Sequence, residues 1–170
     1  MVNLRGLKTA AIEALGIKIY IQEYLTNAFC GTHLAHDGDS VYFHIKVGKG
    51  HALHKTVNKD KDTIDPPRVE RLRWIKVFIS GGVPNSECWL VPDPQSGETK
   101  RVYCSFGDGY VVWLGPRDAG GWKFESAYPC DTATLRGYLK RQGAKRVCVF
   151  PSEQPQLSSQ SDSASSTIVS

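Results

Sequence analysis

The 170-residue sequence lacks long hydrophobic runs. Its apolar stretches, such as 110–114, are far shorter than the roughly 20 residues that a membrane-spanning helix needs. Charges at Arg5 and Lys8 interrupt what would have to be the apolar core of a signal peptide. We therefore expect a soluble protein that acts in the cytoplasm, without a secretion signal or a membrane partner.

Cysteine is sparse, and no Cys-x-x-Cys pair occurs. An odd number of widely spread cysteines does not suit a disulfide framework, and it favours reduced, mostly buried thiols as in a cytosolic protein. The five are Cys30, Cys88, Cys104, Cys130 and Cys148.

The excess of positive charge is small, with 21 Lys and Arg against 17 Asp and Glu. Two of those acids, Glu153 and Asp162, lie in a Ser- and Gln-rich stretch over 151–170 whose composition predicts a disordered tail. The remaining part, 1–150, is predicted to be a single domain with a net charge of +6. That excess permits binding to a polyanion such as RNA without requiring it.

The first half of the chain predicts helices around one strand. Apolar spacing predicts a helix over 4–15 that ends at Gly16, followed by a strand over 17–21 or a continuation of the helix through Leu25. A strand is predicted over 41–47. A helix is then predicted from Pro66 and Pro67 to the glycines at 81–82.

The second half predicts an antiparallel meander, because short β-rich runs alternate with Gly- and Pro-rich turns. Asp131 is placed to cap a last helix that reaches about Arg141, and a final strand is expected over 146–150. Helices followed by a meander predict the α+β fold class. The meander strands are expected at 88–91, 100–106, 110–114 and 122–128.

All five histidines fall within 22 residues of the first third of the chain: His33, His36, His44, His51 and His54. One interpretation is a zinc site built from the two His-x-x-His pairs with Cys30. A second is that His33, His36 and His44 are ordinary strand and loop residues. A third places chemistry at His51 and His54.

The segment 48–56 carries two imidazoles, Lys55 and the hydroxyl of Thr56 between a strand and a helix. RNA cleavage by attack of the 2′-hydroxyl needs such groups: a base, an acid and a cation beside the phosphate. Histidine suits proton transfer because its reference pKa is about 6.5. This chemistry requires no metal and no cofactor.

The predicted strand 122–129 offers further contacts. Strict alternation would place Phe124, Ser126 and Tyr128 on one face, where a hydroxyl and a phenol can bind phosphate and a ring can stack on a base. Arg101 is a further candidate, since guanidinium binds phosphate in a bidentate manner.

Before a predicted helix the sequence has Gly50-His51 and Lys55-Thr56, and its meander ends in Phe124-Glu125-Ser126-Ala127-Tyr128-Pro129. In these two places it resembles the barnase, EndoU, colicin and RelE superfamily of metal-independent ribonucleases. The resemblance covers about 45–130 and is nearest to bacterial EndoU-like toxin domains and their phage-borne relatives. Those domains typically show a Gly-His, a Lys-Thr and a terminal Thr-x-Tyr-Pro strand.

The resemblance implies that His51 is a general acid or base, that Lys55 contacts phosphate, and that Ser126, in place of the commoner threonine, positions substrate with Tyr128. His54 has no matching family residue; it is a second catalytic imidazole or it packs inward. The resemblance also implies a toxin- or defence-like role, an inhibitor or immunity protein, and RNA, such as transfer RNA, as target.

Nine basic residues against four acidic ones over 46–76 would place this site in a positive field. The hypothesis is therefore an endoribonuclease with catalytic His51, His54, Lys55, Ser126 and Tyr128, and with Thr56, Arg101 and Phe124 binding substrate. Two alternatives stay open: the zinc-dependent domain, and a non-catalytic binding module with Trp89, Tyr103, Trp113 and Trp122 as its recognition face.

Overall fold

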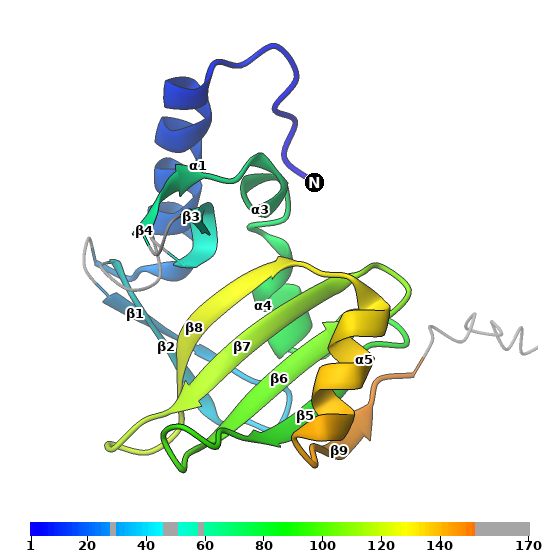
Figure 1. Cartoon of the computed structure of the whole chain (residues 1–170). Coiled ribbons are helices and arrows are strands. Elements are labelled where there is room, and N and C mark those ends of the chain that lie inside the picture. The colour runs from blue at the N-terminus through cyan, green and yellow to red at the C-terminus, as the bar shows by residue number, and fades with distance from the viewer. Residues whose placement is uncertain (28–29, 46–50, 58–59, 152–170) are drawn as a thin grey trace, which may run out of the picture.

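The computed structural model describes residues 1–27, 30–45, 51–57 and 60–151; within these ranges the side chains of 56–57 and 60–62 lie outside the description. A seven-stranded sheet runs in the order β1-β2-β8-β7-β6-β5-β9 (Figure 1). Its strands are β1 (Cys30–Leu34), β2 (Ser40–His44), β5 (Glu87–Pro92), β6 (Thr99–Ser105), β7 (Tyr110–Pro116), β8 (Trp122–Pro129) and β9 (Lys145–Val149). Five neighbouring pairs are antiparallel, and β2 pairs with β8 in parallel.

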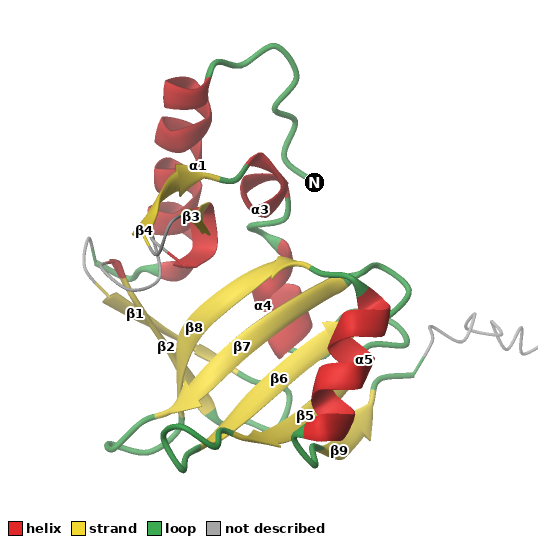
Figure 2. Cartoon of the chain, in the orientation of Figure 1, coloured by secondary structure: helices red, strands yellow, loops and turns green. Residues whose placement is uncertain are grey.

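Helices cover both faces of this sheet (Figure 2). On one face, α5 (Thr132–Arg141) packs Leu135 and Leu139 onto a small core. On the other face, a larger core joins the sheet to α1 (Thr9–Tyr24), α3 (Pro66–Glu70), α4 (Trp74–Ile79) and the hairpin of β3 (His54–Val57) with β4 (Asp60–Ile64). The predicted α+β class of a single compact domain is confirmed.

The first helix differs from the prediction. Gly16 does not end it; the helix begins at Thr9 and continues to Tyr24, with Leu25 as its C-cap. The strand over 17–21 is therefore wrong, and the alternative of a continued helix is confirmed. The reason is tertiary, because a Cβ atom at Gly16 would lie 2.9 Å from Leu53 and 3.3 Å from Val69. The glycine lets α1 approach the segment 51–53 and α3 closely.

The helix expected from Pro66 to the glycines at 81–82 is two short helices, α3 and α4. The buried phenol of Tyr24 lies at their junction, donating to the Leu72 carbonyl (2.5 Å) and accepting from the Lys76 amide (3.4 Å). A hydroxyl from α1 thus bonds to backbone groups at the break.

The meander is confirmed as β5 to β8, and β9 forms at the sheet edge beside β5. The Asp131 carboxylate accepts from the Thr134 amide (2.7 Å), as its predicted role at the start of α5 requires. The half-exposed β1 and the hairpin β3–β4 were not predicted. The strand predicted over 41–47 is β2, which ends at His44. Residues 46 and 47 of that prediction, and residues 152–170 of the predicted tail, lie outside the described residues.

Among the described residues, no helix is both long and apolar enough to cross a bilayer.

We expect stability to fall as the pH rises above about 9. Burial raises the pKa of the Cys88 and Cys104 thiols from 9.0 to about 12, and it raises the pKa of the buried Tyr24 and Tyr110 phenols. These groups keep their protons in the folded chain and lose them in the unfolded one. Their contribution is therefore complete below the unfolded pKa and is lost as the pH climbs through the folded values.

The measurement is the urea midpoint of unfolding between about pH 8 and pH 11. The midpoint should drop across this interval, and a constant midpoint would contradict the prediction.

Candidate functional site

A cavity with a volume of about 920 Å³ lies between α5 and the β7–β8 part of the sheet. Three of the residues predicted to be catalytic line it: His51, Ser126 and Tyr128. They come from segments far apart in the sequence. The remaining lining consists of Lys100, Trp113, residues 123–125, Cys130, Asp131, Thr134, Leu135 and Tyr138.

A β-bulge in β8 decides which side chains face the cavity. Ser126 pairs with Trp113 of β7, whereas Phe124 pairs with Leu114, so Glu125 is an extra residue between them. The predicted alternation is therefore wrong: Ser126 and Tyr128 share the α5 face, and Phe124 belongs to the opposite core. Phe124 also contributes to the cavity lining, but it is only 2% exposed and its ring stacks on Phe43 with centroids 5.1 Å apart. Phe124 is therefore a core residue rather than an exposed platform for a base.

Arg68 of α3 contacts both His51 and Tyr128, which come from distant segments of the chain. No role in the site was predicted for it from the sequence. Its guanidinium donates to the His51 carbonyl (2.8 Å), pairs with Asp65 (3.2 Å) and lies 5.0 Å from the centre of the Tyr128 ring. The half-buried arginine thus holds the backbone of His51 beside Tyr128. The only local signal is the Asp65-to-Arg68 spacing on the first turn of a helix.

The cavity carries both signs of charge. Lys100 lies 3.0 Å from Glu125 and 3.2 Å from Asp93; burial opposes its charge, but these carboxylates raise its pKa. Hydrogen bonds to Thr134 lower the pKa of Asp131, which stays ionised at neutral pH. Lys123 is exposed, and no ion pair joins it to a residue of the described ranges.

Burial raises the pKa of Tyr128. Its phenol therefore keeps its proton at neutral pH and is able to donate a hydrogen bond to a ligand in the cavity. The Trp113 and Tyr138 rings meet edge to face, with centroids 5.7 Å apart, on the same side of the sheet. Together these groups give the cavity an apolar wall with polar donors beside it.

The structure does not bring His54 or Lys55 to this cavity. His54 is 7% exposed in β3, and its Nε2 lies 3.2 Å from Glu13 of α1, so it packs inward. Lys55 follows it in the strand and is exposed. The side chain of Thr56 lies outside the described residues.

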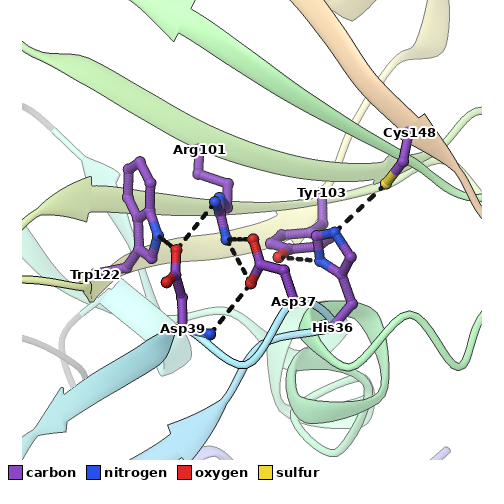
Figure 3. A network of polar contacts seen from close by, with 7 residues as sticks. All are labelled: His36, Asp37, Asp39, Arg101, Tyr103, Trp122 and Cys148. Atoms are coloured by element: carbon purple, nitrogen blue, oxygen red, sulfur yellow. Dashed lines mark hydrogen bonds and ion pairs between the residues drawn. The ribbon is translucent and has the colours of Figure 1, made fainter.

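Arg101 pairs with Leu114 of β7, which belongs to the core on the face opposite α5. Figure 3 shows the polar contacts around its side chain. The residue is 8% exposed, and its guanidinium pairs with Asp37 (2.9 Å) and Asp39 (3.2 Å) and lies 4.4 Å from the Trp122 ring centre. Beside it, Tyr103 contacts His36. These two ion pairs tie the 35–39 turn to the sheet, so Arg101 has a structural role here. It does not line the cavity, and its expected role as a phosphate clamp stays a prediction.

The positive field expected over 46–76 is largely neutralised where it is described. Arg73 and Lys76 both pair with Glu23, and Arg71 lies 3.5 Å from Glu70. Arg68 pairs with Asp65. Lys46, Lys49 and Lys59, with the side chain of Lys61, lie outside the description.

The described residues form neither a zinc site nor a shared aromatic recognition face, the two alternatives to the ribonuclease hypothesis. Within the described ranges, no group of three His, Cys, Asp or Glu side chains is placed to hold a metal ion. The four aromatic residues of the proposed recognition face do not share one: Trp89 and Trp113 lie on the α5 side, Tyr103 is fully buried, and Trp122 stacks on Arg101.

Comparison with protein-family models, curated proteins and solved structures finds no match to this chain.

Proposed function

We propose that the chain is an endoribonuclease that cleaves RNA by attack of the 2′-hydroxyl on the adjacent phosphate, with no metal ion required for the reaction. The observation that supports this best is the gathering of His51, Ser126 and Tyr128 around one cavity of about 920 Å³. An imidazole for proton transfer and two hydroxyl donors are groups that this reaction uses.

The reaction needs two proton-transfer groups. A base takes the proton of the 2′-hydroxyl as the O2′–P bond forms, and an acid protonates O5′ as the P–O5′ bond breaks, leaving a 2′,3′-cyclic phosphate. His54 packs against Glu13 and does not line the cavity, so it does not serve as the second proton-transfer group. In this proposal the second group beside His51 is a carboxylate that lines the cavity. Two carboxylates line the cavity: Asp131 caps α5, and Glu125 forms an ion pair with Lys100. Because the role of Asp131 is to hold the start of the helix, we assign Glu125 as the base and His51 as the acid.

The phosphate and the base have separate places in this proposal. Lys123, the Ser126 hydroxyl and the protonated Tyr128 phenol line the cavity and supply a cation and two donors for the charge that grows on phosphate oxygens. The rings of Trp113 and Tyr138 offer an apolar wall against which a nucleobase can stack.

The test is cleavage of a short RNA and of the same oligonucleotide with a single 2′-deoxy substitution at the cut position, both in excess EDTA. We expect the RNA to yield fragments ending in cyclic phosphate and the substituted strand to stay whole, because it lacks the attacking hydroxyl. Cleavage of the deoxy-substituted strand at that bond, or no cleavage of any RNA tested, would contradict the proposal.

A further inference from the structure

We infer that a basic strip on α5 and β9 is a second RNA-binding surface, which holds single-stranded RNA outside the cavity. The strip consists of Arg136, Lys140, Arg141, Lys145 and Arg146, all of them exposed. This inference rests on the proposed function, because the charge of the strip alone does not distinguish RNA from other polyanions. It adds to that function the path by which the substrate reaches the cavity.

Most of the positive charge of the strip has no ion-pair partner within the described ranges. Residues 132–151 contain these five basic residues and no acidic one, although the chain as a whole is nearly balanced. Within the described ranges, only Arg146 of the five has an ion-pair partner, Glu87 at 3.5 Å. Cations in the last turn stabilise a helix, which accounts for Lys140 and Arg141 but not for Lys145 and Arg146 on the edge strand.

Aromatic rings lie among these cations. The Arg136 guanidinium is 3.7 Å from the ring centre of Phe106, and that of Arg146 is 5.8 Å from Trp89. Both rings line a hollow of about 390 Å³, together with Lys140 and Leu139. Cations interleaved with aromatic rings suit single-stranded nucleic acid, since phosphates bind the cations while unpaired bases stack on the rings.

The geometry of α5 joins this hollow to the cavity. Thr134 and Tyr138 line the cavity, whereas Arg136 and Lys140 line the hollow on the other flank of the helix. A helix with its side chains is about 10–12 Å across. A strand of a few nucleotides that crosses α5 would therefore reach from the hollow to the cavity. Figure 1 shows α5 lying over the sheet near β9, the two elements that carry the strip.

The test uses the full chain and a fluorescent 2′-O-methyl RNA of about 15 nucleotides, which lacks the 2′-hydroxyl needed for cleavage, so that binding is measured alone. The strip variant carries Lys140→Gln, Arg141→Gln and Lys145→Gln. Its matched control carries Arg5→Gln, Lys8→Gln and Lys18→Gln, three exposed cations far from α5 in the sequence with the same change in charge.

We expect the strip variant to bind about tenfold more weakly and to lower the salt dependence of log K by about 0.7 for each phosphate that the protein no longer neutralises. The control should bind like the wild type. Cleavage of a dinucleotide, which is too short to reach the strip, should be equal in all three proteins. Cleavage of a long RNA should slow only in the strip variant.

Equal affinity and equal salt dependence of the strip variant and the wild type would overturn the inference, even if the wild type cleaves RNA. Stronger binding to duplex RNA, or to vesicles with anionic headgroups, would overturn it too. Weaker binding by the strip variant, in a protein that cleaves no RNA, would support the strip and remove the proposed function.

Discussion

Replacement of His51 by alanine is expected to slow RNA cleavage by a factor of about 10²–10⁴, the usual contribution of one general acid or base. His51 is the only imidazole that lines the cavity among the described residues, so no neighbouring histidine can take over. Its backbone is held by Arg68, and this contact does not depend on the imidazole. The fold should therefore survive the substitution.

The measurement is the single-turnover rate on a short RNA in EDTA, with circular dichroism as a check of folding. Glu125→Gln, which keeps the shape of the side chain, should lose activity to a similar degree if Glu125 is the partner base. His44→Ala removes an imidazole that does not line the cavity and serves as the control. An unchanged rate for His51→Ala would remove His51 from the mechanism.

Replacement of Phe43 by alanine is expected to destabilise the protein by about 3–5 kcal/mol, as truncation of a buried aromatic ring does. Phe43 is fully buried in β2, where the rings of Phe124 and Tyr24 lie 5.1 Å and 4.9 Å away. The ring thus joins α1 to β8, the strand that carries Ser126. Such a loss is a large part of the 5–15 kcal/mol by which a typical domain is stable.

Urea unfolding at neutral pH measures this effect. Leu34→Ala, in the adjacent strand β1 but 65% exposed, should change the free energy of unfolding by less than about 0.5 kcal/mol. A loss below about 1 kcal/mol for Phe43→Ala would mean that Phe43 does not join α1 to β8 through the core.

In the proposed activity, the cavity and the basic strip beside α5 have different roles. The cavity holds the groups for chemistry, and the basic strip supplies charge that the paired cations of α3 and α4 do not provide. Recognition of a particular RNA would then depend more on α5 and β9 than on the segment 46–76. The inhibitor protein and the toxin-like role that the family resemblance implies stay predictions.

The sequence by itself determined the features that depend on neighbouring residues. Gly- and Pro-rich turns between β-rich runs predicted the four strands of the meander, and the Asp131 cap predicted the start of α5. Ser126 and Tyr128 were predicted to share a face because they lie two residues apart, beyond the bulge at Glu125. These signals are local, so they need no knowledge of what packs against them.

Only the tertiary structure decided the rest. Gly16 lies inside a helix rather than at its end, because Leu53 and Val69 pack against α1 where a side chain at position 16 would otherwise be. The bulge at Glu125 turns Phe124 into the core, and burial between two aspartates makes Arg101 a structural residue. Arg68 gains its role from His51 and Tyr128, distant partners that only folding brings together. Packing and charge pairing act between segments far apart in the chain, and no local pattern records them.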